Sequence, residues 1–219
     1  HSSGHSLEDA EILARNLGMP FEVRPIKFLF STASRELSER RGELTPLALE
    51  NLQSRLRGLI LMTFSNHYNA LVLTTGNKSE MATGYGTLYG DMVGALDPIG
   101  DLFKTRVYEL ARHLNLTLKN PIPERTLTKA PSAELRPNQT DQDTLPPYDA
   151  FDLLLEGYIE RGMTVAELQK KFGAAPGTRG PEWIKEILQR LERNEFKRRQ
   201  APPVLKISPK AFGIGRRIP

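Results

Sequence analysis

The chain has 219 residues, 39% of them hydrophobic and 26% charged. These values are close to those of ordinary globular domains and exclude wholesale disorder, and the length fits one α/β domain with or without a small helical addition. There is no cysteine, which excludes disulfides, thiolate nucleophiles and zinc–thiolate sites and suits a reducing cytoplasm. No apolar run is long enough to span a bilayer and no signal-peptide pattern opens the chain, so we expect no membrane partner.

The charge balance is modestly positive. Lys and Arg number 30 against 26 Asp and Glu, a formal net charge of +4. This excess suits a polyanionic ligand, either a nucleotide or a nucleic acid. Much of it lies between Lys185 and Arg217, where aromatic residues are not interleaved with the basic ones as a stacking platform for nucleic acid requires. We therefore interpret this tail as a solvated surface rather than a nucleic-acid interface.

The first elements are a helix and a short strand. The pattern predicts a helix from Ser6, which can cap it, to Gly18, with Asp9 at the reciprocal capping position. A short strand is predicted over residues 21–26. A longer helix is predicted to begin near Thr45, with a proline at its first helical position.

A strand, a tight turn and a helix follow. The apolar run at residues 70–75 predicts a strand buried on both faces. It ends at Gly76, and a helical pattern restarts near Ser79. This geometry is typical of phosphate handling, because ligands gather at the carboxyl ends of strands in open α/β sheets. After a glycine-rich stretch at residues 84–100, another helix is expected over residues 102–114.

The C-terminal part reads as a loop followed by helices. Residues 119–147 are rich in Pro, Asp, Thr and Asn and predict a long loop, a kind of segment that is usually functional or disordered. Helices are predicted at residues 148–161, 164–172 and 181–199, the second beginning with Thr164 and Glu167 as a capping box. The whole predicts an α/β fold, a Rossmann-like parallel sheet with flanking helices and a helical C-terminal tail. We interpret residues 1–219 as a single partial domain: a nucleotide-binding core at 5–118, the loop at 119–147 and a helical region at 148–219.

The densest group of candidate residues surrounds the turn after the predicted buried strand. A hydroxyl at Thr75, a glycine that allows close backbone approach and a helix start with free N–H groups together make a nucleotide site plausible. Glu80 stands in the first turn of that helix and could hold Mg²⁺, which prefers one or two carboxylates plus substrate phosphates. The alternative is that Glu80 only stabilises the helix N-terminus, and spacing alone favours that alternative.

Two further clusters carry polar groups at helical spacing. Asn51 and Arg55 are four residues apart on one helix face, and Arg55 could bind a carboxylate or phosphate through two hydrogen bonds. A solvated helix face is the alternative. Lys104 could reach a phosphate as a movable point charge, or form a surface ion pair with Asp101. Asp97 is a further acidic residue of this cluster.

Ser132 and Lys197 are two further candidates for binding phosphate or substrate. Ser132, which follows a proline, can turn its hydroxyl towards a phosphate or cap a short helix. Lys197 ends a helix, where a cation is stabilised by the helix dipole without any binding role.

Taken together, these segments resemble the NAD synthetase family over nearly the whole chain. The string Thr-Thr-Gly-Asn-Lys-Ser-Glu at residues 74–80 is similar to the glutamine-dependent branch. The resemblance depends on the order of the matching segments and on the residues of this string, since any one segment alone would be weak evidence. The matching segments are residues 5–10, 50–55, 73–80, 84–91, 129–137 and 197–202.

The resemblance implies a fold of the adenine nucleotide α-hydrolase type, shared with the N-type ATP pyrophosphatases, and a homodimer or higher homo-oligomer. It implies a carbon–nitrogen ligase that uses ATP, Mg²⁺ and either ammonia or glutamine to convert deamido-NAD into NAD. The carboxylate of deamido-NAD attacks the α-phosphorus of ATP and expels pyrophosphate. Ammonia then displaces AMP from the adenylated intermediate.

The resemblance also implies roles for single residues. It makes Glu80 and Lys104 catalytic, with Glu80 as a magnesium ligand. Contacts to ATP are implied at Thr75, Lys104 and Ser132. Contacts to deamido-NAD are implied at Asn51, Arg55, Tyr85, Gly86, Thr87, Leu88 and Lys197.

One family feature is missing. Members of the family carry a Ser-Gly-Gly-x-Asp-Ser loop after their first strand, which grips pyrophosphate, and no such string occurs here. We therefore expect the first strand and loop to precede this chain in the intact protein, together with a glutaminase domain. Two alternatives remain: another ATP pyrophosphatase ligase, GMP synthetase-like or tRNA-modifying, and a basic nucleic-acid-binding module. Asn51 with Arg55, and the wording of residues 75–80, argue against the first.

These 219 residues alone are accordingly expected to make NAD very slowly or not at all, because the pyrophosphate grip is missing. The measurement is NAD formation from ATP, ammonia and deamido-NAD by this chain. Measurable turnover would contradict the expectation.

Overall fold

The computed structural model describes residues 3–39, 42–174 and 180–216, so His1 and Arg217 lie outside the described residues. Within it the chain forms two compact units. The first unit comprises residues 1–53 and 106–145, and the second comprises residues 54–105 and 146–219. The single-domain organisation that the sequence suggests stays a prediction.

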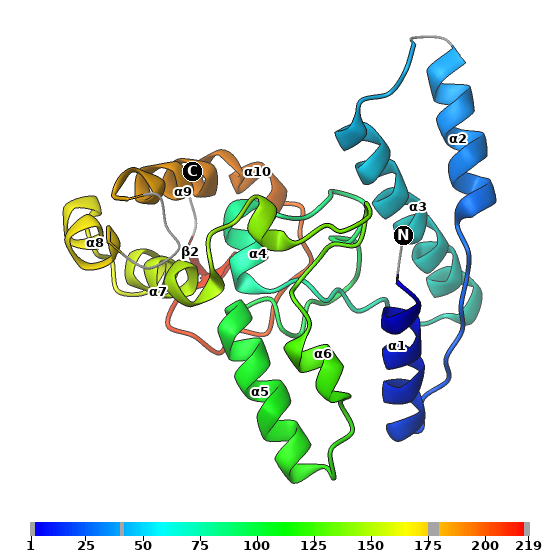
Figure 1. The fold of residues 1–219 in the computed structure, drawn as a ribbon, viewed down its shortest axis with the longest axis horizontal. Helices are drawn as coiled ribbons and strands as arrows, with labels where there is room; N and C mark the ends of the chain where they lie inside the picture. The colour runs from blue at the N-terminus through cyan, green and yellow to red at the C-terminus, as the bar shows by residue number, and fades with distance from the viewer. Residues whose placement is uncertain (1–2, 40–41, 175–179, 217–219) are drawn as a thin grey trace. The chain divides into compact units, whose positions relative to one another are not determined.

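The first unit is built from helices and their connections (Figure 1). Its elements are α1 (Gly4–Asn16), α2 (Lys27–Glu39), the start of α3 (Pro46–Tyr68), most of α5 (Lys104–Thr117), α6 (Glu124–Thr128) and the 3₁₀ turn η1 (Asp141–Asp143). The predicted start of the long helix, just after Thr45, is confirmed. The segment predicted as a loop holds α6 and η1.

The predicted cap of the first helix is wrong. Ser3, not Ser6, caps α1, and its hydroxyl accepts a hydrogen bond from the Ser6 N–H at 3.1 Å. The Ser6 hydroxyl instead donates to Glu134 at 2.5 Å. Asp9 is not a capping residue either, because its carboxylate accepts hydrogen bonds from Arg125, whose guanidinium lowers the pKa of Asp9. Groups that resemble a capping signal in sequence therefore hold residues 125–134 against α1.

Residues 21–26 form no strand, contrary to the prediction, and lead directly into α2, which the sequence did not predict. Pro25 lacks the N–H that a strand interior needs. No residue of α2 is buried, and Phe28 is 82% exposed.

The second unit contains the rest of α3 and, among its described residues, seven further helices and strands besides the beginning of α5 (Figure 1). These elements are α4 (Lys78–Thr83), α7 (Tyr148–Ile159), α8 (Val165–Phe172), α9 (Glu182–Arg193), α10 (Glu195–Arg198) and the paired strands β1 (Ala211–Phe212) and β2 (Gly215–Arg216). The predicted capping box of Thr164 and Glu167 is confirmed at the start of α8. The last predicted helix divides at Asn194 into α9 and α10.

The apolar core of this unit lies where α7, α8 and α9 pack together. Within α7 and α9 its fully buried side chains recur at spacings of three, four and seven residues, which is the period of a helix face. They are Phe151, Leu154, Leu155, Leu168, Ile184 and Leu191. Burying such side chains stabilises a fold by roughly 1.5–3 kcal/mol each, before conformational entropy is counted.

Parallel pairing is present but short. Leu73 forms a parallel bridge with Leu96, and Asp97 forms one with Val204. The predicted strand at residues 70–75 is therefore paired, but the prediction that it is buried on both faces is wrong. Thr74 is buried, whereas Leu71 and Leu73 are 77% and 56% exposed. The described residues cover one face only, and alternation along a strand turns every second side chain to the other face.

The C-terminal end of α4 is held by cations of the basic tail. Arg190 donates to the Thr83 carbonyl at 3.1 Å, and Arg198, 7% exposed, donates to the Ala82 carbonyl at 2.8 Å. Lys197 donates to the carbonyls of Gly84 and Gly86, both at 2.7 Å. The last carbonyls of a helix lack intrahelical partners and attract positive charge. This part of the tail is thus structural rather than a solvated surface.

Gly84, with φ at 64°, ends α4 in the left-handed region, and a side chain there would also meet Asn194, whose Cβ would lie 2.7 Å away. We expect Gly84→Ala to lower the free energy of unfolding by more than the about 1–2 kcal/mol that the backbone conformation alone costs. Gly162→Ala is the matched control, because Gly162 has φ at 67° and open space around it. Urea denaturation of both variants would test this; equal losses would show that Asn194 gives way.

Candidate functional site

The start of α4 carries the central acidic residue. Asn77 caps the helix by accepting a hydrogen bond from the Glu80 N–H at 3.1 Å, and the Glu80 carboxylate accepts one in return from the Asn77 N–H at 3.2 Å. This reciprocal box fits the sequence Asn-Lys-Ser-Glu. Glu80 therefore does stabilise the helix N-terminus, which was the alternative to a role in binding magnesium. That role engages one of its two oxygens.

The other oxygen faces Lys104. The Lys104 ammonium lies 3.1 Å from Glu80 Oε1, and the two side chains are 20% and 23% exposed. The same ammonium lies 5.7 Å from the centre of the Tyr148 ring. The surface ion pair considered between Lys104 and Asp101 is not formed. Asp101 is 3% exposed and pairs instead with Lys78 at 2.8 Å.

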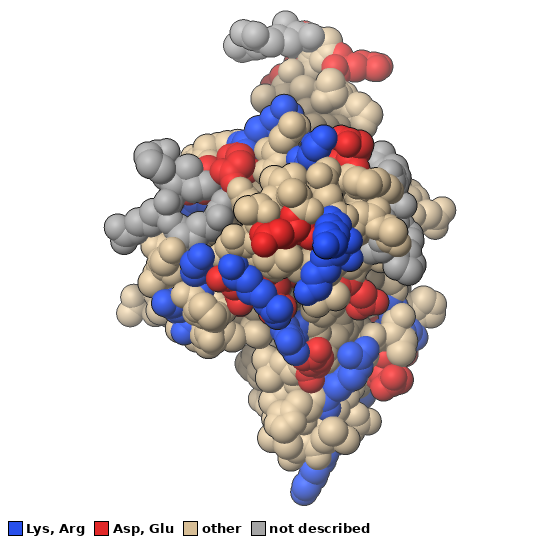
Figure 2. Space-filling view, turned by 90° about the vertical axis from the view of Figure 1, so that its left-hand side faces the viewer, with Lys and Arg blue, Asp and Glu red and all other residues tan. Residues whose placement is uncertain are grey.

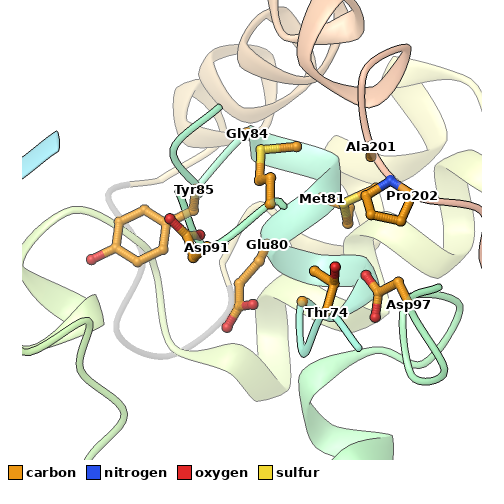
Figure 3. Close-up of a pocket in the computed structure, with 12 residues that line it drawn as sticks. Thr74, Glu80, Met81, Gly84, Tyr85, Asp91, Asp97, Ala201 and Pro202 are labelled. Carbon is orange, nitrogen blue, oxygen red and sulfur yellow. The ribbon is translucent and has the colours of Figure 1, made fainter. Parts of the chain in front are cut away.

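A pocket opens beside this pair and encloses about 340 Å³, part of it open solvent. It is lined by residues of α4, of the segments after the paired strands and of the chain following α10. Figure 3 shows the Glu80 carboxylate projecting from α4 on the side where Thr74 and Asp97 lie, with the Tyr85 ring directed elsewhere. The lining includes Thr74, Gly76, Glu80, Met81, Gly84, Tyr85, Gly86, Asp91, Met92, Asp97, Ala201 and Pro202.

Asp97 is the most unusual group of the pocket. It is fully buried, and neither carboxylate oxygen has a hydrogen-bond partner among the described residues. Burial, reinforced by the negative charge of Glu80, raises its pKa to about 7, although the nearby Ile99 and Gly100 amides act in the opposite direction. A buried polar group without a partner is uncommon in proteins. The sequence drew attention to Asp97 only as a neighbour of Asp101 and gave no signal of this isolation.

The residues implied to contact deamido-NAD come together in part. Arg55 donates to the Leu88 carbonyl at 3.2 Å. Tyr85 and Gly86 line the pocket, and Lys197 binds the Gly86 carbonyl, as described above. Burial lowers the pKa of Lys197. The ammonium of Lys197 thus binds backbone carbonyls of residues 84–86, two of which are themselves implied to contact deamido-NAD.

Thr87 completes the turn in that segment. It is buried, and its N–H donates to Asp91 at 2.9 Å. Asp91, which the sequence reasoning left without a role, also accepts a hydrogen bond from Ser54 at 2.7 Å. In the sequence, Asp91 follows a glycine-rich stretch and looks like an acidic residue of an ordinary turn, so no local pattern predicted these contacts.

Three further implied residues are Thr75, Asn51 and Ser132. Thr75 is exposed, and the pocket is lined instead by Thr74, whose hydroxyl donates to the Val93 carbonyl at 2.7 Å. Asn51 and Ser132 belong to the first unit, where the Ser132 hydroxyl accepts a hydrogen bond from the Glu134 N–H at 3.1 Å. Their roles towards ATP and deamido-NAD stay predictions, as do those of all the other implied site residues.

Comparison with known proteins identifies the family. The profile of the NAD synthase family matches residues 1–201. The chain belongs to this family. A glutamine-dependent NAD(+) synthetase of Aquifex aeolicus is 47% identical over 219 residues, which are 100% of this chain and 37% of that relative. The chain therefore spans little more than a third of the length of this NAD synthetase.

Solved structures of the family agree. A glutamine-dependent NAD+ synthetase of Acinetobacter baumannii, in complex with ADP, matches with a TM-score of 0.58 and 37% identity, over 100% of this chain and 38% of that one. An NMN synthetase of Francisella tularensis matches with a TM-score of 0.68 and 26% identity, over 88% and 71% respectively. The α/β, adenine nucleotide α-hydrolase-like fold expected from the sequence is confirmed by the NAD+ synthetase neighbour, although the described strands are short.

Two other expectations can be compared with the described residues. None of the described helices combines the length and apolarity that crossing a bilayer requires. On the face that Figure 2 shows, Lys and Arg are mixed with Asp and Glu rather than gathered into one basic patch.

The burial of Asp97 predicts a pH-dependent stability. Its pKa is about 7 in the folded chain against an ordinary value of 3.8, so the folded state holds this proton more tightly. Its contribution to stability is full below about pH 4 and is lost as pH rises to about 7. We expect Asp97→Asn to abolish this part of the pH dependence and to be the more stable protein at pH 8.

Urea denaturation at pH 5 and pH 8 in metal-free buffer measures the effect. Glu186→Gln, which removes an exposed carboxylate of α9, is the control. A stability difference between wild type and Asp97→Asn that is the same at both pH values would show that Asp97 is ionised throughout.

Proposed function

We propose that the protein carrying this chain converts deamido-NAD into NAD by ATP-dependent amidation, with glutamine or ammonia as nitrogen donor. Membership of the NAD synthase family supports the reaction class. The observation that carries the proposal is the Glu80–Lys104 pair at the edge of a pocket, at the start of a helix that follows a paired strand. A carboxylate paired with a cation at the edge of a pocket suits magnesium-bound phosphates.

The chemistry has two steps. The carboxylate oxygen of deamido-NAD forms a bond to the α-phosphorus of ATP as the bond to pyrophosphate breaks. Ammonia then forms the amide bond, AMP leaves with the bonding electron pair, and the nitrogen loses its extra proton. A carboxylate is a poor acylating agent, and making AMP the leaving group removes that obstacle.

Glu80 and Lys104 serve the first step. Negative charge accumulates on the departing pyrophosphate, and a fixed cation lowers the energy of that transition state. The Glu80 carboxylate fits Mg²⁺ that arrives with ATP, since this ion takes one or two protein carboxylates and completes its shell with phosphate oxygens and water. A magnesium ion held by Glu80 would bring its phosphates close to the Lys104 ammonium, which lies 3.1 Å from Glu80 and would pair with them as a point charge.

Residues 84–88 are proposed to contact the dinucleotide through Tyr85 and Gly86. Lys197 shapes this segment by holding two of its carbonyls. Arg55 supports it from α3 through the Leu88 carbonyl. Thr75, Asn51 and Ser132 keep their implied roles as proposals. The homodimer and the cytoplasmic location also stay predictions.

The direct test is product analysis with the full-length protein. We expect ATP, Mg²⁺, deamido-NAD and ammonium to give NAD, AMP and pyrophosphate in equal amounts. Because a structural neighbour is an NMN synthetase, nicotinic acid mononucleotide is the competing substrate to include. Release of ADP instead of AMP, or amidation of the mononucleotide alone, would refute the proposal.

Glu80→Gln isolates the charge of the central residue. Glutamine at this position still supports the capping box, so we expect the thermal stability to change little. The kcat for NAD formation should fall by at least about 10²-fold, as expected when a group that stabilises transition-state charge is removed. Glu186→Gln again serves as the control. Activity within twofold of wild type, with an unchanged Mg²⁺ dependence, would exclude Glu80 from the site.

A further inference from the structure

Asp152 lies on α7, outside the pocket, and is 4% exposed. The Ser79 hydroxyl donates to its Oδ1 at 2.5 Å, and the backbone N–H of Thr105 donates to its Oδ2 at 2.8 Å. Burial raises the pKa of Asp152, and these hydrogen bonds oppose the rise. Both oxygens are thus engaged by two segments that are far apart in the sequence.

These contacts fix the beginning of α5. The first N–H groups of a helix have no partner within the helix, so groups from elsewhere must satisfy them. The Lys104 N–H donates to the Ser79 hydroxyl oxygen at 2.9 Å, and the next N–H, of Thr105, donates to Asp152. A carboxylate at a helix N-terminus is also favoured by the helix dipole. Ser79 and Asp152 together therefore act as the cap of α5.

The same contacts determine how Glu80 and Lys104 meet. Ser79 precedes Glu80 on α4, and Lys104 is the first residue of α5, so the hydrogen bond between Ser79 and the Lys104 backbone links the two helix starts that carry the ion pair. Tyr148, whose ring lies near the Lys104 ammonium, is four residues before Asp152 and so shares its face of α7. One face of α7 thus contacts the backbone of Thr105 and the side chain of Lys104.

We infer that Asp152 is a positioning residue that holds Lys104 against Glu80 and thereby sets the geometry in which the site receives magnesium-bound ATP. The inference rests on the proposed function. Positioning matters because a displacement of about 1 Å in a reacting group can reduce the rate by about 10²-fold. Asp152 touches neither pocket nor substrate in this scheme, and acts through Ser79 and Thr105.

Asp152→Asn is the informative variant because it keeps size and shape. Its single oxygen can still accept from the Thr105 N–H. Its NH₂ group then faces the Ser79 hydroxyl, which loses the acceptor for its own proton while it continues to accept from Lys104. The cap of α5 is retained in part, and the link from Ser79 is disturbed. Leu168→Ala is the control, since it opens the buried core of the same unit between α7, α8 and α9.

Two measurements on the ligand-free chain and the full-length protein test the inference. In the ligand-free chain, the amides of Lys104 and Thr105 should exchange at least about tenfold faster in Asp152→Asn than in Leu168→Ala. Each variant is measured at the same interval below its own Tm, so that a general loss of stability does not account for the difference. In the full-length protein, kcat/KM for magnesium-bound ATP should fall at least about tenfold, while KM for deamido-NAD stays within about twofold.

The outcomes separate the inference from the proposed function. Unchanged exchange at residues 104 and 105, or a control that reproduces both effects, would overturn the positioning role. If the exchange changes but kcat/KM for ATP does not, Asp152 is only a helix cap and the inference fails. If the wild-type protein makes no NAD, the proposed function fails, and with it the reading of Asp152 as a catalytic support, whereas the exchange result still decides whether it fixes α5.

Discussion

The arrangement of the second unit depends on one buried ammonium group. Lys78, the first residue of α4, has no exposed surface, and its Nζ lies 2.8 Å from Asp101 and 2.6 Å from Glu160. It also donates to the Ser208 hydroxyl at 2.7 Å and to the Lys210 carbonyl at 2.9 Å. Removing one partner of a buried ion pair typically destabilises a protein by about 3–5 kcal/mol, so these contacts can be exchanged only together.

This constraint gives α4 the character of a fixed platform. The partners of Lys78 come from the C-cap of α7, from the connection before α5 and from the C-terminal segment, so segments distant in sequence meet at the first turn of a six-residue helix. Burial alone would raise the pKa of Asp101, but hydrogen bonds from Lys78 and from the amides of residues 207 and 208 lower it. With its far end held by Arg190 and Arg198, α4 presents Glu80 from a support that is held at both ends.

The sequence predicted what depends on local signals. The strand–turn–helix around Gly76, the helix that begins after Thr45 and the capping box of α8 each have a short pattern with a physical cause, and the pocket does include Glu80, Tyr85 and Gly86. Family resemblance supplied predicted roles where spacing could not decide between alternatives, and those roles stay predictions.

What the sequence could not predict depends on partners far along the chain. Ser6 and Asp9 fit a helix cap but bind residues more than 100 positions away. The isolation of Asp97 and the engagement of Asp152 likewise arise from packing, since neither residue differs in its local pattern from any other aspartate. The basic tail was misread for the same reason. Composition records its charge, whereas the backbone carbonyls that receive Arg198 are known only from the fold.

The half-covered strand at residues 70–75 has a practical consequence for handling these 219 residues. Leu71 and Leu73 present apolar side chains beside a backbone that, among the described residues, pairs only towards Leu96. Such an edge is a template on which identical molecules can add strands to one another. Self-association at high protein concentration would follow from this edge, independently of nucleotide, and a lysine at position 71 would act as a gatekeeper against it while leaving the pocket residues untouched.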